Sequence, residues 1–458
     1  MGRYNLLDEK WITVLRKDSG ETENVSLLNL FEHAGEYRAL AGEMEVQNFA
    51  ILRVLLAVLT TVFTRVDATG EAYEWIELDD SDKLIVEEAV DEAYVDDYIE
   101  DLNDTWKSIW ENHCFPPTVC QYLKAWHDRF YLLDDKYPFF QVTKKDLVDR
   151  LPKGKNGTQF AGKQLNRMIS ESNNKEAIFA PVAGQGKSHM TEAELARWLI
   201  TMQGYIGTAD KAKFPKESKE KDSKGWLYDI GGIYMAGEDL FETLWMNTML
   251  YHIEDDVRYT ITPQSPCWED IPSERLQAIL EGRPLKNLAA LYTLWSRAAY
   301  ISPAWAADKD VSVEAVKLTE IIHENAFIAN DLTLNNFIAR YEKEISAFFN
   351  FYNSKMTYAD LLSTISDFLI PKLYPRVDLT NLSTYQRKSL ELYSTKADHW
   401  NLINQYKAYV ESSKEKKKEK KNFEENKELY ATYKITNKDP TVYNVVKEHQ
   451  KANAQINV

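Results

Sequence analysis

The chain has 458 residues and a formal net charge of −16 at pH 7. This length is ample for a large core, and no repeat of fixed period is visible, which excludes a repeat architecture. The three cysteines stand without a Cys-x-x-Cys pair, so the spacing indicates neither a disulfide framework nor a zinc knuckle. The N-terminus lacks an apolar signal core, and the longest apolar run, residues 49–63, is interrupted by Arg53 and too short for a bilayer. We therefore expect a cytoplasmic protein without a membrane partner.

The negative charge is concentrated in one stretch. Residues 71–104 carry fifteen acidic side chains against Lys83 alone, a net of −14, which leaves −2 for the rest of the chain. Two later stretches are basic, with a net of +5 over residues 144–190 and +3 over residues 211–224. Because non-specific affinity for nucleic acid comes from Lys and Arg near phosphates, these two stretches keep a nucleic-acid partner open.

The first part of the chain predicts strands and then helices. Residues 11–15 alternate in polarity and residues 25–27 follow a turn, which predicts short strands. From residue 45 to residue 65 apolar side chains recur at helical spacing, which predicts a long core helix. The acidic stretch predicts an exposed helix with a solvated face. Residues 105–142 are rich in aromatic side chains, a pattern typical of core packing.

The later part predicts a loop region followed by helices. Residues 151–188 are rich in Gly, Asn and Lys and predict a surface loop. A helix is expected over residues 191–203, opened by a capping box of Thr191 and Glu194, and another over residues 238–252. Residues 312–413 predict almost continuous helix, the first of its helices over residues 313–329.

These elements predict an α+β fold with three parts. A large mixed N-terminal domain is expected over residues 1–311. A helical subdomain with the character of an insertion is expected over residues 312–425. Residues 426–458 read as an incomplete C-terminal segment.

Residues 178–188 nearly match a phosphate-binding P-loop. They end in Gly186, Lys187 and Ser188, as the motif requires, but Pro181 stands where the opening glycine should be. Proline has a fixed φ and no N–H to donate to a phosphate. The pattern favours a Gly-rich loop with a protruding apolar tip, Phe179. A P-loop NTPase that uses Gly186, Lys187 and Ser188 is the enzymatic alternative.

Signatures of catalysis are missing from the sequence. It contains no Gly-x-Ser-x-Gly elbow, no His-Glu-x-x-His and no dinucleotide fingerprint, and its eight histidines include no pair four residues apart. We therefore expect a binding protein rather than an enzyme, with no cofactor. A scaffold that docks a basic protein through acidic residues 71–104 is a further alternative.

Several segments together resemble one protein family. In chain order they are residues 5–14, Met44 and Glu45 with the apolar helix that follows, residues 130–142, Phe179 with residues 184–186, and residues 291–297. The segment Phe130 to Val142 is the most specific of these matches. The family is CasA, the large subunit of the type I-E CRISPR surveillance complex Cascade.

The resemblance implies non-catalytic recognition of DNA. In that family the large subunit inspects the protospacer-adjacent motif of double-stranded target DNA, supports strand separation against the guide RNA and recruits a helicase-nuclease. The implied partners are target DNA, the 5′ end region of the guide RNA, the other Cascade subunits and the helicase-nuclease. The residues expected to contact nucleic acid by position are Phe179, Ala180, Gln185, Gly186, Lys187, Gly204, Gly207, Lys211, Lys213 and Lys224.

The chain departs from the family pattern in three respects. It lacks the paired cysteines that hold zinc in some relatives, so we expect no metal. Pro181 and Val182 stand where Asn and Gln commonly follow the Phe. The family ends in a four-helix bundle with a Gln wedge, and residues 439–458 stop short of it. We expect either a truncated or split form, or inserted helices that replace the bundle.

Overall fold

The computed structural model describes the first two thirds of the chain with gaps. The described residues are 2–172, 177, 180–182, 184–207, 212–215, 225, 227–228, 234, 236–250, 264–281, 283, 287–307 and 309–318. The helices predicted after residue 318 and the C-terminal segment lie outside these residues. By its contacts the chain divides into two compact units, of which the first comprises Met1–Tyr228, Gly237–His252 and Arg258–Asn325. All features below belong to this first unit.

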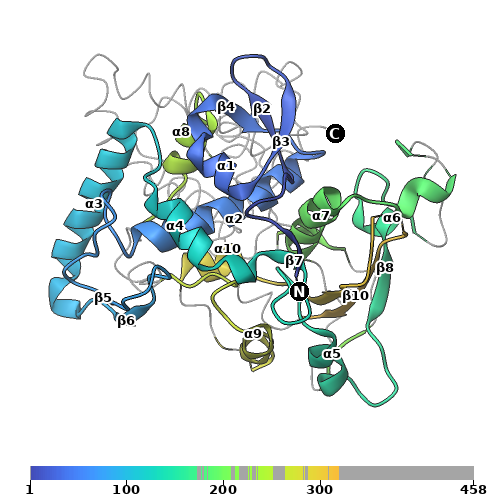
Figure 1. The fold of residues 1–458 in the computed structure, drawn as a ribbon. Coiled ribbons are helices and arrows are strands. Elements are labelled where there is room, and N and C mark those ends of the chain that lie inside the picture. The colour runs from blue at the N-terminus through green and yellow to red at the C-terminus, as the bar shows by residue number, and fades with distance from the viewer. Residues whose placement is uncertain are drawn as a thin grey trace, which may run out of the picture. The chain divides into compact units, whose positions relative to one another are not determined.

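The unit is a mixed α+β fold, as predicted (Figure 1). Its described helices are α1 Leu27–Glu32, α2 Glu45–Phe63, α3 Val95–Asn112, α4 Thr118–Ala125, α5 Lys144–Arg150, α6 Gly162–Leu165, α7 Glu192–Tyr205, α8 Leu240–Met246, α9 Pro272–Leu280 and α10 Leu288–Tyr292. Short 3-10 helices are η1 Ala34–Glu36, η2 Glu92–Tyr94, η3 His127–Arg129 and η4 Gly184–Ser188.

Ten described strands form four small sheets. The strands are β1 Arg3–Asn5, β2 Ile12–Arg16, β3 Thr22–Val25, β4 Tyr37–Leu40, β5 Glu77–Leu78, β6 Val86–Glu88, β7 Tyr131–Leu133, β8 Thr158–Ala161, β9 Arg297–Ile301 and β10 Ser312–Lys317. The sheet orders are β3-β2-β4, β8-β10-β9, β1-β7 and β5-β6. Every ladder between these described strands is antiparallel. The described residues therefore contain no parallel α/β sheet.

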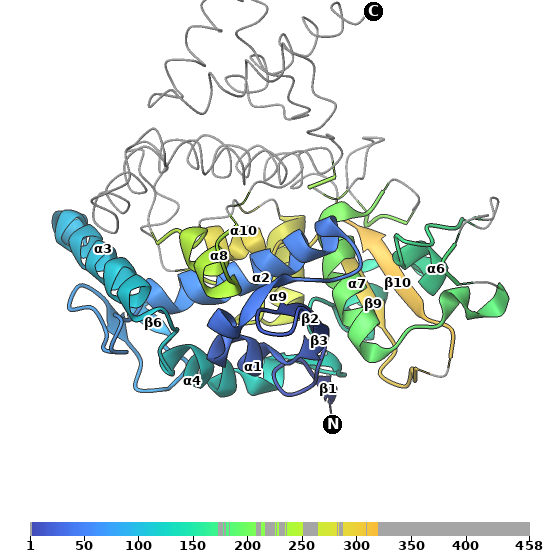
Figure 2. The ribbon, with the colours of Figure 1, turned by 90° about the horizontal axis from the view of Figure 1, so that it is seen from above.

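Helix α2 is the centre of the core, which confirms the predicted core helix. It contacts α4, α7, α8 and α10 (Figure 2), and almost all of its side chains are buried. By length and composition it could cross a membrane, yet 94% of that window is buried inside the protein, as in a core helix. Its buried Arg53 donates to Leu291 O at 2.9 Å and lies over the Tyr292 ring. Burial lowers the pKa of Arg53 to about 10.

The acidic stretch contains the exposed helix that the sequence predicts. Helix α3 buries Tyr98, Leu102 and Ile109 on one side, and its acidic residues are mostly exposed on the other. Whether this face docks a basic protein stays a prediction. The aromatic-rich region packs largely as core, for example Phe130 stacked on Phe139 with ring centroids 5.2 Å apart.

Two local predictions are wrong, and a third gives the right type of element over too long a range. The loop expected over residues 151–188 contains strand β8 and helix α6, and the helix expected over residues 238–252 is limited, within the described residues, to α8. The helix expected from residue 313 is a strand, β10, which pairs with both β8 and β9. Pairing with β9 and with β8, which lies about 150 residues earlier, overrides the local helical pattern. Residues 312–317 thus belong with the N-terminal fold, while the rest of the predicted domain division stays a prediction.

A buried side chain of α7 ties the helix to the start of β9. Gln203 Nε2 donates to Phe140 O at 3.1 Å and to Arg297 O at 3.0 Å. Its Oε1 accepts from the backbone N–H groups of Ser296 and Arg297, both at 3.0 Å. One amide therefore satisfies four backbone groups in the interior, where each would otherwise be costly to leave unpaired.

We expect Gln203→Leu to lower the free energy of unfolding by about 3 kcal/mol or more, because it removes four buried hydrogen bonds to the backbone. Urea denaturation measures the change. The matched control is Gln121→Leu on the exposed surface of α4, for which we expect a change within about 0.5 kcal/mol. Similar losses in the two variants would contradict the assignment.

Candidate nucleic-acid interface

Many of the residues predicted to contact nucleic acid lie on or near β8, α6, η4 and α7 (Figure 1). Helix α6 packs against η4, and this contact requires a glycine. A Cβ on Gly162 would lie 2.3 Å from Ser188 O, and Ser188 O also accepts from Val311 N at 3.0 Å. The two ends of the intervening segment are therefore held against each other and against the residue before β10.

Glu171 closes the base of this segment. Its side chain is 6% exposed, and its Oε1 accepts from Lys163 Nζ at 2.9 Å. Its Oε2 accepts from Lys187 Nζ at 2.5 Å and from Ala177 N at 3.1 Å. The hydrogen bonds from Lys187, Lys163 and the Ala177 backbone lower the pKa of Glu171 to about 2. The carboxylate is thus ionised at neutral pH and joins α6, Ala177 and η4.

The geometry does not support the P-loop alternative. Gly186, Lys187 and Ser188 lie in the 3-10 helix η4, and the Lys187 side chain is only 15% exposed and bound to Glu171. A P-loop needs a lysine free to reach phosphates, after a strand in a βα unit. The described residues provide neither feature.

Helix α7 carries the opposite wall of the site. It opens with the predicted capping box, which the structure confirms: Thr191 Oγ1 accepts from Glu194 N at 3.2 Å, and Glu194 Oε2 accepts from Thr191 N at 2.8 Å. Near its middle, Arg197 pairs with Glu43 and donates to Trp11 O at 2.7 Å. These contacts anchor α7 to the N-terminal residues.

The residues predicted to contact nucleic acid differ in how far they are buried. Gly204 is buried in α7, where Leu227 and the backbone of Gly225 pack against it. That burial indicates a packing role, and the expected contact of Gly204 with nucleic acid gains no support. Ala180, Gly186 and Gly207 are half-buried, and Lys213 is exposed. Outside the described residues lie Phe179, Lys211, Lys224 and the side chain of Gln185.

Much of the positive charge predicted over residues 144–190 is committed to ion pairs. The pairs are Lys144 with Glu314, Arg150 with Asp146, and both Lys163 and Lys187 with Glu171. Within the described part of this stretch, the cations with no ion pair are Lys145, Lys153, Lys155 and Arg167. Sequence reasoning missed this distinction, because it counts charges without their partners.

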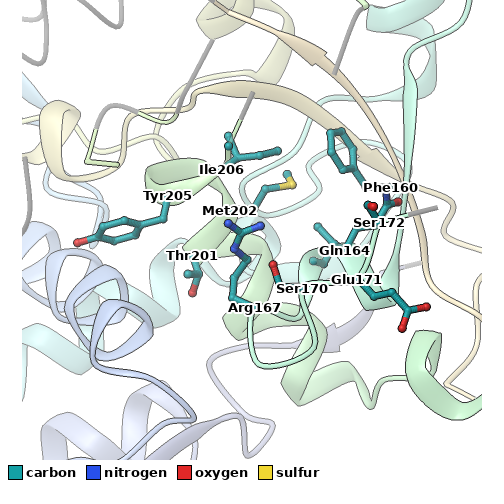
Figure 3. Close-up of a pocket in the computed structure, with 12 residues that line it drawn as sticks. Phe160, Gln164, Arg167, Ser170, Glu171, Ser172, Thr201, Met202, Tyr205 and Ile206 are labelled. Atoms are coloured by element: carbon teal, nitrogen blue, oxygen red, sulfur yellow. The ribbon is translucent and has the colours of Figure 1, made fainter. Parts of the chain in front are cut away.

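A cavity of about 170 Å³ lies between β8, α6 and α7 (Figure 3). The sequence offered no signal for it, since its walls come from segments about forty residues apart. Its lining residues are Phe160, Gln164, Leu165, Arg167, Ser170, Glu171, Ser172, Thr201, Met202, Tyr205, Ile206 and Gly207. Of the four described cations without an ion pair in residues 144–190, Arg167 lines this cavity.

The described residues offer no cluster for a metal ion, and two of their three cysteines are buried while Cys114 is exposed. They contain no group of three or more His, Cys, Asp or Glu placed to hold a metal ion. Burial raises the pKa of the Cys120 thiol to about 11 and that of Cys267 to about 12, so neither is a reactive thiolate.

The described residues define a mixed α+β protein with antiparallel sheets and a loop closed at its base by a carboxylate. The family model described as CRISPR-associated protein Cse1 matches residues 5–336. The chain belongs to this family, which confirms the resemblance drawn from its sequence.

Relatives of the family are distant in sequence. The chain is 23% identical over 305 residues to CRISPR-associated protein CasA/Cse1 of Thermus thermophilus, which covers 64% of this chain and 47% of the relative. It is 24% identical to the crystal structure of Thermobifida fusca Cse1, with a TM-score of 0.48 over 69% of this chain and 52% of that one. It is 13% identical to a chain of a CRISPR RNA-guided surveillance complex, with a TM-score of 0.48 over 69% and 56%. The chain thus spans about half the length of the proteins it matches.

We expect Glu171→Gln to destabilise the protein in a pH-dependent way. The pKa of Glu171 in the folded protein, about 2, lies below its usual 4.5. The ionised carboxylate therefore stabilises the fold fully above pH 4.5, and this stabilisation is lost as the pH falls toward 2. Urea denaturation from about pH 6 to about pH 3 should show the difference between wild type and Glu171→Gln shrinking as the pH is lowered.

The control for that experiment is Glu21→Gln, since Glu21 is exposed and has no ion pair among the described residues. Its difference from wild type should stay small at every pH. A difference for Glu171→Gln that stays constant across the range would show that the carboxylate does not carry the stabilisation.

Proposed function

We propose that this chain acts as the non-catalytic large subunit of a type I-E Cascade complex in the cytoplasm. In this role it recognises the protospacer-adjacent motif of double-stranded target DNA, aids R-loop formation with the guide RNA and recruits a helicase-nuclease. Membership of the Cse1 family over residues 5–336 is the observation that carries the proposal. The other Cascade subunits are the partners that complete the assembly.

The closed loop base supports a recognition role for residues 178–188. Glu171 binds Ala177 N and Lys187 Nζ, so the chain enters and leaves this segment at a fixed distance. A loop held at both ends loses less conformational entropy when it binds. We propose that Phe179, Ala180, Gln185 and Gly186 contact the DNA beside the target, with Lys187 serving mainly to hold the loop.

The pairing of several cations near the loop disfavours tight non-specific binding, and we propose that the loop reads the minor groove. The groove presents a degenerate base pattern that backbone groups and a few polar side chains can read. Phosphate contacts here fall to the exposed cations, Lys213 among them. We propose Gly207, Lys211 and Lys224 as further contacts. The modest number of such cations suits a subunit that shares its nucleic acid with neighbours.

In a complex reconstituted with this chain, we expect targets with the flanking motif to bind more tightly than targets without it. Phe179→Ala should reduce that difference by about tenfold or more while leaving assembly intact, because an apolar tip contributes about 1–3 kcal/mol to a contact of this kind. Electrophoretic mobility shifts with the two duplexes measure the effect. The matched control is Tyr94→Ala, which removes an aromatic ring that is 50% exposed in the acidic region.

Equal affinity of the wild-type complex for the two duplexes would refute the proposed function. Unaltered discrimination by the Phe179→Ala complex would instead show that the positional assignment of Phe179 is wrong. A loss of discrimination in Tyr94→Ala as large as that in Phe179→Ala would also contradict the assignment.

A further inference from the structure

The cavity beside the loop base has the size and walls of a site for one flat ring. Phe160, Leu165, Met202 and Ile206 are all buried and supply apolar surface. Its volume is about 170 Å³, and an apolar cavity of about 150 Å³ in another protein accommodates benzene. A single six-membered ring therefore suits the space better than a fused double ring.

The amide of Gln164 offers hydrogen-bond donors for such a ring. Gln164 Oε1 accepts from Ala161 N at 2.9 Å, which fixes the orientation of the amide. Its Nε2 has no hydrogen-bond partner among the described residues, so two N–H donors remain for a ligand. These donors suit an exocyclic carbonyl oxygen on a ring.

Arg167 provides a cation at the same cavity. Figure 3 shows its side chain extending toward Met202, while the ring of Tyr205 points away. The Arg167 guanidinium has no ion pair within the described part of the chain, unlike Lys163 and Lys187 nearby. A free guanidinium beside an apolar wall is suited to a phosphate attached to the ring.

The backbone that carries Arg167 is held in one conformation. Asn166 Oδ1 accepts from Met168 N at 2.9 Å, and Asn166 O accepts from Ser170 N at 2.8 Å. Ser170 has a φ of 49°, in the left-handed region that a non-glycine residue rarely adopts. The turn is thus preorganised, and Glu171 follows it directly.

We propose that this cavity binds one unstacked pyrimidine nucleotide of a single strand. The ring lies against Met202 and Phe160, Gln164 donates to a ring carbonyl oxygen, and Arg167 binds the phosphate. The proposal rests on the proposed function, because strand separation there produces unpaired bases. Guide RNA and displaced DNA present the same chemistry, and the experiment separates them.

The test uses the full chain and fluorescently labelled strands of about ten nucleotides: oligothymidylate, oligouridylate and a fully abasic strand. Fluorescence anisotropy should show oligothymidylate or oligouridylate binding about tenfold more tightly than the abasic strand. The tighter of the two identifies DNA or RNA as the source. Equal affinity for all three strands would overturn the proposal.

Three variants separate the contributions. Met202→Phe fills the cavity without changing charge, so it should abolish the preference for strands with bases. Gln164→Leu should weaken binding of oligothymidylate about threefold and leave the abasic strand unaffected. Arg167→Ala should weaken every strand and reduce the slope of log affinity against log salt by about one. The control Lys155→Ala, at an exposed cation that does not line the cavity, should keep the base preference.

A base preference that persists in both Met202→Phe and Gln164→Leu would overturn the proposal. Defective assembly of the Met202→Phe complex with unchanged strand binding would also overturn it, and would identify a side chain of another subunit as the occupant. Measuring motif-dependent duplex binding by the same complexes distinguishes failure of the proposed function from failure of the nucleotide-binding cavity. If the motif dependence holds while the base preference is absent, this inference fails and the proposed function stands.

Discussion

The interface depends on the amide of Gln203, which fixes the start of β9 to α7. Its four hydrogen bonds hold Ser296, Arg297 and Phe140 against the helix. Because β9 pairs with β10 and β10 pairs with β8, this anchor sets the position of the whole sheet relative to α7. The walls of the cavity come from β8 and α6 on one side and from α7 on the other. A buried polar side chain thus determines the geometry of a site to which it makes no contact itself.

Glu171 limits the positive charge that the candidate interface presents. One carboxylate neutralises part of the charge of two lysines and binds the backbone of Ala177 at the same time. With a pKa near 2 it stays ionised at neutral pH, so Lys163 and Lys187 remain committed to the loop base. The basic stretch of the sequence therefore serves two purposes. Some of its cations stabilise the loop, and others, such as Arg167, have no ion pair within the described residues.

Features set by neighbouring residues could be predicted from the sequence, and those set by distant pairing could not. The apolar periodicity of α2 and the capping box at Thr191 are local patterns, and both are confirmed. Strand β10 pairs with β8 about 150 residues earlier, as in Val313 opposite Phe160, and no local pattern encodes that partner. For the same reason the role of Gln203 could not be predicted, because its partners are distant in sequence and its helix shows only another polar residue. The family resemblance succeeded because it used several segments in order.

The contrast between local sequence and distant contacts also explains why residues 178–188 resemble a P-loop without its geometry. The motif defines which residues follow one another, whereas phosphate binding needs an uncommitted lysine and free backbone amides. Here Glu171 lies sixteen residues before Lys187 in the chain and occupies its ammonium group. Gly162, on the adjacent helix, leaves room for the Ser188 carbonyl, which accepts from Val311 N. The ammonium group that a nucleotide would require is therefore already used to close the loop. Lys187 and Ser188 therefore help to close the base of the loop, whereas Arg167, on the neighbouring turn, borders the cavity and has no ion pair within the described residues.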